Sequence, residues 1–403
     1  MKHYLGIAYR FAALVVFKVA GLPMLYLLEP FVRVRMRDLF QDRIGHLSSM
    51  NEVMARRWYR DGKPQKSKYI FFSSSYPSNQ FLLKMWKRKL YIIENRWLNS
   101  AYYGFQPALK KTRFYAGVPI VETAHDLLSE MPPVLKFTEA EESEGQRNLR
   151  LMGVGENDWF MCFHARDASY LTSRPGFNSH GLKDPYRNCS IENYMASAEW
   201  VAVNGGVAIR VGFLVDAPLQ ENAHPRIIDY STKHRSDFMD VYLSAKCKFF
   251  LGNSSGLICV PVCFNRYTAQ ANKVPLTASG LGNKQLFTPK LLYSLELGRI
   301  LTFPEMHSMG LFDTSTTEKW RERERAEFYV SLGLKWIENT SEDVLDLTKD
   351  MMDMVDGNRP PSRAVELQER YRYFHSEHLS GPQSSRIGPR FALKYSHLIE
   401  NKL

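Results

Sequence analysis

The stretch Trp159-Phe-Met-Cys-Phe-His-Ala-Arg-Asp167 sets the organisation of this chain, because an apolar run stops there at an imidazole, a guanidinium and a carboxylate. Residues 159–163 are too few for a typical helix and are rich in aromatic side chains, which favours a buried strand. His164, Arg166 and Asp167 then follow the carboxyl end of that strand. In open α/β sheets, ligands bind outside the carboxyl ends of the strands. The sequence therefore predicts a ligand site at these three residues.

Arg166 has the chemistry to bind a pyrophosphate. Its planar guanidinium can hold two phosphate oxygens at once, and it stays charged while doing so. A second interpretation is that Arg166 and Asp167 pair with each other at a solvated strand end. The two residues alone leave both interpretations open.

Segments of alternating strand and helix character follow, after a loop over residues 168–189 that is rich in Ser, Gly, Pro and Asn. Apolar spacing predicts helices over 191–204 and 238–245, and buried strands over 207–211, 226–230 and 247–251. The last strand leads into Gly252-Asn-Ser-Ser-Gly256 and an apolar segment. A strand, a turn of small residues and a helix aim backbone N–H groups at phosphate. Residues from about 157 onward are therefore predicted to form a parallel-sheet domain.

Four motifs resemble a family of bacterial glycosyltransferases of the GT-B type. They are Arg43-Ile-Gly-His-Leu47, Phe163-His-Ala-Arg-Asp167, the segment from Arg235 to Leu243, and Lys248-Phe-Phe-Leu-Gly-Asn-Ser-Ser-Gly256. The resemblance runs unevenly from about residue 32 to residue 305. It implies an α/β fold with two Rossmann-like domains facing a cleft, a nucleotide-sugar donor bound mainly by the second domain, and no obligatory metal.

The second motif is more distantly similar to fucosyltransferases, in which an arginine at this place binds the β-phosphate of the donor. The sequence departs from that pattern, because Asp167 follows Arg166 immediately, whereas the acid of fucosyltransferases comes later. By resemblance, Arg166 is a catalytic residue that stabilises charge on the leaving diphosphate. Donor binding is assigned to His164, Asp167, Asn253, Ser254, Ser255, Gly256, Asp237, Asp240 and Glu305.

Three of these donor-side acids have alternative roles. Asp237 and Asp240 are expected either to orient Arg166 or to cap their own helix. Glu305 follows a predicted strand and Pro304, so it would accept hydrogen bonds from a ribose diol or else be a surface acid. No metal ligand and no cofactor are expected, since the nucleotide-sugar is a co-substrate.

The acceptor side is expected in the first domain. Residues 31–36 alternate apolar and basic side chains, which predicts a strand with one exposed face. Gly45 would let the backbone turn tightly into a following helix, with His46 near its amino terminus. In GT-B enzymes the corresponding loop faces the acceptor, and a histidine titrating near pH 7 would act there as general base. The alternative is a histidine that caps or packs under its own helix. Arg43, Gly45 and Asn79 form the predicted acceptor-side loop.

A chain of 403 residues exceeds the usual size of one hydrophobic core, so two domains are expected. A helix with acidic residues early and basic residues late matches helix-dipole preference and is interpreted as the link between them. The predicted organisation is a membrane-associating segment over 1–30, an acceptor domain over 31–137, a linking helix over 138–157, a donor domain over 158–375 and a helical tail over 376–403.

Charge is distributed unevenly along the chain. The net charge is +11, yet residues 1–113 carry 21 Lys and Arg against 6 Asp and Glu. Such a basic end suits nucleic acid or an anionic membrane surface, and no nucleic-acid-binding motif supports the first. The five cysteines are scattered without a C-x-x-C pair, which is typical of a reducing compartment.

Residues 4–28 are strongly apolar but are interrupted by Arg10 and Lys18, so their uncharged runs fall short of the roughly 20 residues that span a bilayer. This pattern favours a segment lying in the membrane interface, with a secretory signal or a core helix as alternatives. The expected function is sugar transfer from a nucleotide-sugar to a lipid-linked or cell-envelope glycan, by a peripheral enzyme at the cytoplasmic membrane face. The alternatives are a non-catalytic nucleotide-sugar or glycan-binding protein, and an epimerase, for which no Gly-x-Gly-x-x-Gly fingerprint is found.

Overall fold

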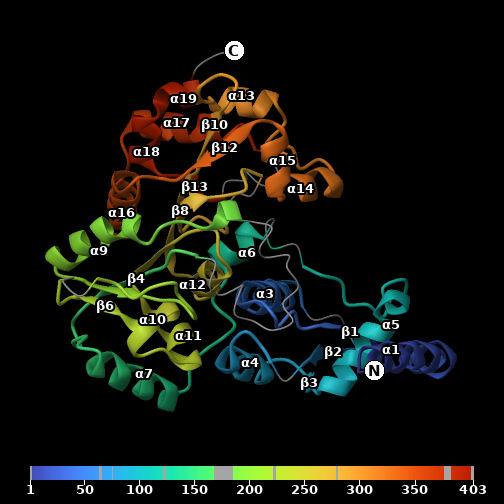
Figure 1. Ribbon diagram of the computed structural model, residues 1–403. Coiled ribbons are helices and arrows are strands. Elements are labelled where there is room, and N and C mark those ends of the chain that lie inside the picture. Colours follow the sequence, from blue (N-terminus) through green and yellow to red (C-terminus); the bar gives the residue numbers. More distant parts are fainter. Residues whose placement is uncertain are drawn as a thin grey trace. The chain divides into compact units, whose positions relative to one another are not determined.

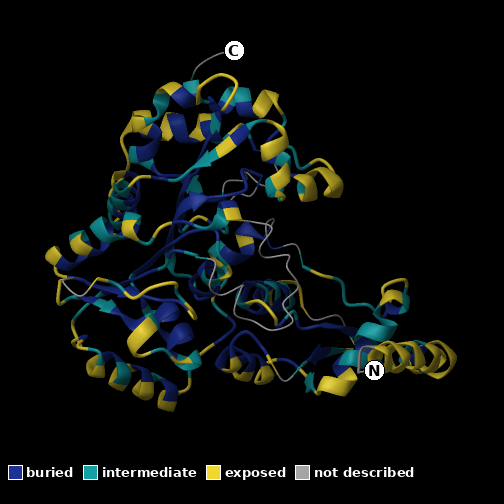
Figure 2. Ribbon diagram, viewed as in Figure 1, coloured by how far each residue is buried: buried dark blue, intermediate teal, exposed yellow. Residues whose placement is uncertain are grey.

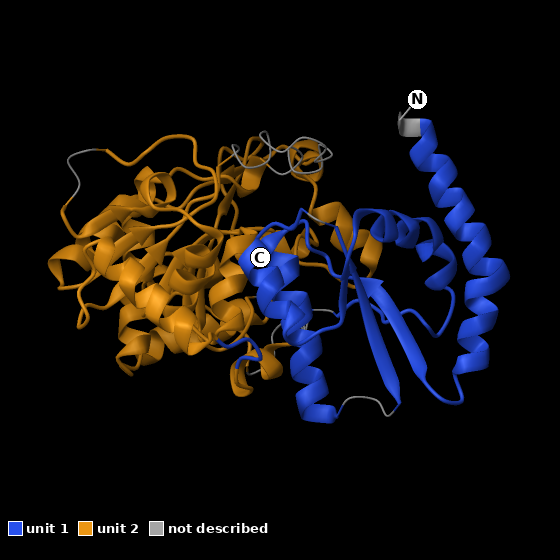
Figure 3. Cartoon of the chain, turned by 90° about the horizontal axis from the view of Figure 1, so that it is seen from below, with its two compact units in different colours: residues 1–121, 133–136 blue, residues 122–132, 137–403 orange. Residues whose placement is uncertain are grey.

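The computed structural model describes residues 2–62, 66–74, 76–119, 121, 124–167, 185–220, 224–277, 280–375 and 383–400. The chain divides into two compact units (Figure 3). Unit 1 comprises residues 1–121 and 133–136, and unit 2 comprises residues 122–132 and 137–403. Each unit contains a parallel sheet flanked by helices, which confirms the predicted α/β class (Figure 1).

Unit 1 is built on a three-stranded parallel sheet in the order β1-β2-β3. Its strands are β1 (Arg33–Asp38), β2 (Ser67–Ser73) and β3 (Ile92–Glu94). A parallel bridge between Met36 and Tyr115 adds a further extended segment beside β1. The sheet is flanked by the π-helix η2 (His46–Met50), α3 (Asn51–Asp61), α4 (Gln80–Lys87) and α5 (Arg96–Leu109).

The two faces of the unit 1 sheet have different neighbours, because successive strand residues point to opposite sides. Met36 and Phe72 pack with residues of α5 and of the N-terminal helices. On the opposite face, Tyr69 lies against Trp58 of α3, with ring centroids 4.4 Å apart. The N-terminal helices and α3 therefore cover opposite faces of this sheet.

The N-terminal helical run consists of α1 (Lys2–Val16), the π-helix η1 (Phe17–Gly21) and α2 (Leu22–Leu28). Gly104 of α5 permits close packing against α1, since an added Cβ would lie 2.3 Å from the carbonyl oxygen of Arg10. Most residues of this helical run are exposed: only 11% of an 18-residue window within residues 4–28 is buried. By length and composition, this run is also apolar enough to cross a membrane.

Unit 2 is built on a seven-stranded parallel sheet in the order β13-β9-β8-β7-β4-β5-β6. The strands are β4 (Phe160–Phe163), β5 (Val207–Arg210), β6 (Ile227–Asp229), β7 (Phe249–Gly252), β8 (Tyr267–Lys273), β9 (Gln285–Pro289) and β13 (Arg386–Ile387). The four strands predicted between residues 159 and 251 are all present. From β4 the chain builds outward through β5 and β6, then returns to place β7 on the other side of β4. The strand order therefore reverses between β4 and β7, as in doubly wound nucleotide-binding sheets.

Helices cover both faces of this sheet. Met161 and Phe163 of β4 pack on one face with α9 (Glu192–Val203) and α16 (Ser341–Val355). Phe160 and Cys162 pack on the other face with α7 (Glu139–Leu151) and α11 (Asp237–Lys246). Figure 2 shows the central strands as buried and the outer sides of α7 and α9 as exposed. The continuous apolar run of β4 thus reflects a strand buried on both faces.

A second, antiparallel sheet in unit 2 has the order β11-β10-β12 and was not predicted. Its strands are β10 (Leu291–Ser294), β11 (Arg299–Ile300) and β12 (Leu334–Ile337). The segment predicted as a helical tail also contributes strand β13 to the main sheet. The other helices of unit 2 are α6 (His125–Glu130), η4 (Pro185–Arg187), α10 (Tyr230–Lys233), η5 (Gly256–Ile258), α12 (Cys259–Cys263), α13 (Phe303–Ser308), α14 (Thr317–Arg323), α15 (Ala326–Ser331), α17 (Ser362–Arg372), α18 (Pro389–Lys394) and α19 (Ser396–Glu400).

Candidate functional site

The carboxyl ends of β4 and β7 lie side by side at the point where the strand order reverses. Phe163 pairs with Leu251, and the His164 amide donates to the Leu251 carbonyl over 2.9 Å. The segments that leave the two strands carry Arg166 on one side and Ser254 on the other. The structure thus brings together the two motifs that the sequence places about 90 residues apart, at the place where α/β sheets bind ligands.

Asn253 ties the two strand ends together. Its side chain is 0% exposed; the Oδ1 atom accepts from the Arg166 amide over 3.1 Å, and Nδ2 donates to the Arg187 carbonyl over 2.8 Å. Nδ2 also approaches the Cys189 Sγ atom at 3.1 Å. Because both ends of this side-chain amide bond to backbone groups of the protein, Asn253 shapes the loop and is not available to a ligand.

The two serines of the turn differ in their surroundings. Ser254 is buried, and its Oγ accepts from Gln270 Nε2 over 3.1 Å and from the Val274 amide over 2.9 Å. Ser255 is half-buried, and its Oγ has no hydrogen-bond partner among the residues that the structure describes. Ser255 directly precedes Gly256, the exposed first residue of η5. The Ser255 hydroxyl is thus buried without a partner among the described residues, whereas Ser254 holds β7 to the segment after β8.

Arg166 and Asp167 are half-buried at the end of β4. The Arg166 carbonyl accepts from the Cys189 amide over 3.0 Å, so both backbone groups of Arg166 are fixed. Asp167 Oδ2 accepts from the Asp216 amide over 3.0 Å. Burial, followed by the charge of Asp167, raises the pKa of Asp216. These bonds fix the backbone from which the guanidinium projects.

His164 is held in one tautomer. Its Nδ1 lies 3.0 Å from the Val211 carbonyl, and because a carbonyl only accepts, Nδ1 carries the hydrogen and Nε2 is an acceptor. Burial lowers the pKa of His164 to about 4. The imidazole is therefore neutral at pH 7, so His164 contributes no charge to phosphate binding.

Asp237 and Asp240 lie in the first turn of α11. Both pair with Arg235, whose Nη2 lies 2.8 Å from Asp240 Oδ2. Tyr230 donates to the other Asp240 oxygen over 2.9 Å, and burial raises the pKa of Asp240 to about 6. The N-cap of α11 is Ser236, which accepts from the Met239 amide. The helix-capping role is therefore wrong, because Ser236 occupies the N-cap, and the two acids pair with the neighbouring Arg235.

Glu305 lies within α13 and not at a strand end. Its carboxylate accepts from the Thr302 amide in a capping box and pairs with Arg299 over 2.6 Å. The Arg299 hydrogen bond, despite some opposing burial, lowers the pKa of Glu305 to about 2. This supports the surface-acid interpretation over a contact with ribose.

The sequence analysis did not identify two cationic residues near the place where the strand order reverses. Arg187 lies in the segment that binds Asn253, and the buried Lys290 donates from Nζ to the Asn188 carbonyl over 2.7 Å. Burial lowers the pKa of Lys290. The available signal for Lys290 was its position directly after the buried strand β9. No sequence pattern indicated Arg187, since residues 168–189 were predicted only as a loop.

The carboxyl end of β1 carries the predicted acceptor-side loop of unit 1. The turn after β1 is made by Phe40 (φ 57°), whereas Gly45 has a helical φ of −62°, so Gly45 was wrongly assigned the tight turn. His46 begins η2 and is half-buried. Burial, followed by the charge of Arg43, lowers the pKa of His46 to about 4. The expectation of a histidine titrating near pH 7 is therefore wrong.

Asp38 is a second titratable group at this end of β1, and sequence reasoning missed it. It is buried, and its Oδ2 accepts from the Tyr103 hydroxyl over 2.9 Å. Burial raises the pKa of Asp38 to about 6. Arg43 is exposed on the same loop. Asn79 is buried as the N-cap of α4 and accepts from the Leu82 amide over 2.8 Å, so its side chain serves the helix.

Among the described residues, no group of three or more His, Cys, Asp or Glu side chains is arranged to hold a metal ion. The predicted loop residues 168–184 lie outside the described residues.

The chain matches no protein family by sequence. It also matches no curated protein. Similar solved structures include a glycosyl transferase of family 9 from Veillonella parvula, with 11% identity and a TM-score of 0.41 over 60% of this chain and 80% of that one. Another is the E. coli heptosyltransferase WaaC with ADP, with 10% identity and a TM-score of 0.33 over 64% of this chain and 91% of that one. Both likenesses are weak.

Proposed function

We propose that this protein is a metal-independent glycosyltransferase that moves a sugar from a nucleotide-sugar to a lipid-linked or cell-envelope glycan. The observation that carries the proposal is the placement of Arg166 and the Ser254-Ser255-Gly256 turn on the two strands between which the sheet order reverses. In doubly wound sheets this is where nucleotides bind. The motifs at these strand ends are the ones that resemble GT-B glycosyltransferases.

In this proposal, unit 2 binds the donor. Breaking the glycosidic bond to a nucleoside diphosphate places charge on the β-phosphate, which a positioned guanidinium stabilises. Arg166 supplies that guanidinium, and Ser255 with the Gly256 backbone supplies uncharged donors. His46, neutral at pH 7 because its pKa is about 4, would accept the proton from the acceptor hydroxyl as it attacks.

Replacing Arg166 with alanine is expected to weaken nucleoside-diphosphate binding by roughly 10- to 150-fold, since a hydrogen bond to a charged group contributes about 1.5–3 kcal/mol. Arg166→Lys should restore only part of the affinity, because a point charge does not reproduce a planar fork. Isothermal titration calorimetry with the diphosphate measures the effect. Equal weakening for the bare nucleoside would show that Arg166 supports the fold instead of binding phosphate.

The neighbouring serines provide a matched comparison. Ser255→Ala should weaken diphosphate binding modestly without changing stability, because its hydroxyl has no partner in the described part of the protein. Ser254→Ala should instead lower stability, since its Oγ is a buried acceptor for two donors. If Ser254→Ala weakens binding and Ser255→Ala lowers stability, the diphosphate contacts Ser254 and not Ser255.

The proposed activity is tested by a thermal-shift panel of nucleotide-sugars with product detection. A ligand present at about 100 times its Kd stabilises the protein by roughly 2.7 kcal/mol. Transfer to a glycan acceptor, or slow hydrolysis of one bound donor, would support a transferase. Binding without either reaction would favour the non-catalytic nucleotide-sugar or glycan-binding protein.

We also propose that the N-terminal helices attach the protein to the cytoplasmic membrane face. The supporting observations are the exposed apolar side chains of α1, η1 and α2, among them Leu5, Phe11 and Val19, each at least 63% exposed. One side of α1 is occupied by α5, and Tyr9 donates to the Trp97 carbonyl over 3.1 Å. A helix docked on its own domain in this way suits a position in the interface better than one across the bilayer.

The triple substitution Leu5→Glu, Phe11→Glu and Val19→Glu is expected to release the protein from anionic vesicles in a sedimentation assay. The matched control is Leu151→Glu, Val203→Glu and Val330→Glu, which changes three equally exposed apolar residues of unit 2. The parent's binding should weaken partly with salt, because the Debye length falls from about 10 Å at 0.1 M to about 3 Å at 1 M. Equal release by both triple variants would remove this assignment of the anchor.

A further inference from the structure

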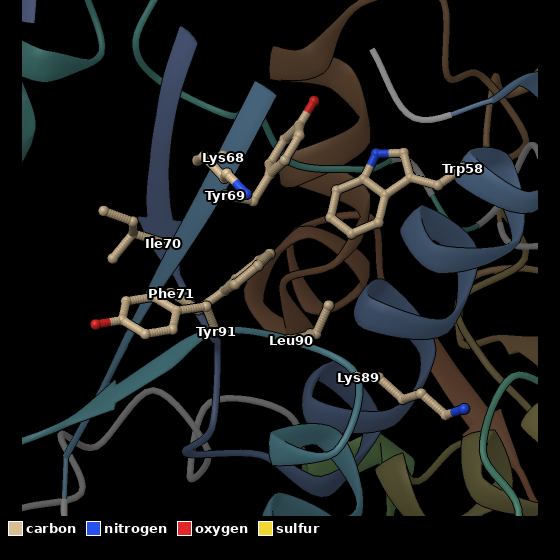
Figure 4. Close-up of a pocket in the computed structure, with 8 residues that line it drawn as sticks. All are labelled: Trp58, Lys68, Tyr69, Ile70, Phe71, Lys89, Leu90 and Tyr91. Atoms are coloured by element: carbon tan, nitrogen blue, oxygen red, sulfur yellow. The ribbon is translucent and has the colours of Figure 1, made fainter. Parts of the chain in front are cut away.

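A hollow of about 390 Å³ lies in unit 1 between α3 and β2 (Figure 4). Its wall contains four aromatic residues and two aliphatic ones: Trp58, Tyr69, Phe71, Tyr91, Ile70 and Leu90. Figure 4 shows the Trp58 indole on the helical side, across from the Tyr69 phenol of β2. Tyr91 is 69% exposed, so an aromatic surface is open to solvent here. Pockets with apolar walls and few polar groups are the usual binding sites for small molecules.

Two lysines give the hollow its charge. Lys68 and Lys89 both line it and are exposed, and no acidic residue among those that the structure describes does so. In the described residues, neither ammonium group lies within ion-pair distance of a carboxylate. The hollow is therefore suited to a ligand with an apolar face and a negative charge.

The hollow is at the opposite end of the unit 1 sheet from His46. Lys68 is the second residue of β2, and Tyr91 directly precedes β3, so the hollow lies at the amino ends of these parallel strands. His46 follows the carboxyl end of β1. Seven residues of strand span roughly 20 Å, so a ligand in the hollow is well separated from the proposed base.

The position of the hollow argues against a lipid headgroup as its ligand. Tyr69 and Trp58 lie on the face of the sheet that α3 covers, whereas Met36 and Phe72 face α5 and the N-terminal helices. A membrane in contact with α1 would lie on the far side of the sheet from the hollow. A soluble or polymeric ligand fits this arrangement better.

We propose that this hollow is an accessory subsite for an acidic sugar of the acceptor glycan, which rests on the glycosyltransferase function proposed above. The apolar C–H face of a pyranose packs on aromatic rings, as apolar groups generally do. Figure 4 draws the Lys68 and Lys89 ammonium groups on different sides of the rings, so a carboxylate or phosphate on one sugar pairs with one lysine and that of another acidic sugar pairs with the other. The subsite binds a part of the acceptor several sugar units from the hydroxyl that reacts, so it favours long acidic acceptors over short ones.

The proposal is tested by measuring the binding of tetragalacturonate to the full-length protein by calorimetry, without any donor. Lys68→Glu with Lys89→Glu should weaken binding by about tenfold or more, since each exposed ion pair contributes up to about 1 kcal/mol and the substitution adds repulsion. Tyr91→Ala should weaken it by about 2- to 10-fold. The matched controls, Lys110→Glu with Lys111→Glu and Tyr373→Ala, change equivalent exposed residues elsewhere and should bind as the parent does.

Several outcomes would overturn the proposal. One is a parent protein that binds tetragalacturonate no better than neutral maltotetraose. Another is an equal loss in the Lys110 and Lys111 control, which would indicate a general effect of net charge. A third is a Lys68→Glu, Lys89→Glu variant that no longer sediments with anionic vesicles but binds the oligosaccharide unchanged. That result would assign the hollow to lipid. Because the readout is direct binding, it succeeds or fails independently of nucleotide binding and sugar transfer.

Discussion

Replacing Glu52 with alanine is expected to lower the free energy of unfolding of unit 1 by about 3–5 kcal/mol, because the change removes one partner of a buried ion pair. Glu52 and Arg56 are both 0% exposed, and Glu52 Oε1 accepts from Arg56 Nε over 2.8 Å. The same oxygen accepts from the Val134 amide over 2.8 Å. Glu52 therefore joins α3 to residues 133–136, which belong to unit 1 although the residues on either side of them belong to unit 2.

Denaturant unfolding followed by circular dichroism measures this loss, with the transition of unit 1 analysed separately. Glu52→Gln keeps an oxygen acceptor and should cost less than Glu52→Ala. Replacing both Glu52 and Arg56 with leucine should recover much of the loss, since apolar side chains often substitute for a buried ion pair without penalty. A loss below about 1 kcal/mol in Glu52→Ala would mean that water or another group compensates the arginine.

The variant His46→Ala is expected to lower kcat by roughly 10²- to 10⁴-fold while leaving donor binding nearly intact, if His46 is the general base. We expect a value near the lower end, because a histidine with a pKa of about 4 is a weak base at neutral pH. Steady-state kinetics with the donor and acceptor measures the loss. Turnover within a few-fold of the parent would assign His46 a structural role.

The pH dependence of kcat/KM separates His46 from Asp38. A base acts only when deprotonated, so activity is lost as the pH falls through its pKa. If His46 is the base, the acidic limb should lie near pH 4, and if Asp38 is the base it should lie near pH 6. Asp38 is only 5% exposed, which favours His46 as the group that reaches an acceptor.

Sequence reasoning located strands β4 and β7 well because their signals were local. The run at residues 159–163 is apolar throughout and ends at charged residues, and β4 was found at Phe160–Phe163. The same holds for β7 and the small-residue turn after it. Their adjacency in the sheet and the strand order of unit 2 come from the structure alone.

The failures concern properties that depend on tertiary neighbours. Asn79 and Asn253 are used by the protein's own backbone, and an amide that caps a helix has the same sequence signature as one that binds a ligand. The pKa of His46 depends on burial, which the loop sequence does not reveal. The antiparallel sheet pairs β10 with β12 across about 40 residues, with no turn signal to connect them.

The bond between Arg166 and Asn253 has a consequence for how unit 2 is made in the cell. The two residues are 87 positions apart, and β5 and β6 are synthesised between them. At about 5–20 residues per second, Arg166 is added to the growing chain roughly 4–17 s before Asn253. During that interval the nascent chain holds the strands on one side of β4 while the other edge of β4 lacks its partner. The backbone of Arg166 acquires its bond to Asn253 only after the later half of the sheet has been made, so this junction of the β4 and β7 ends is completed late in translation.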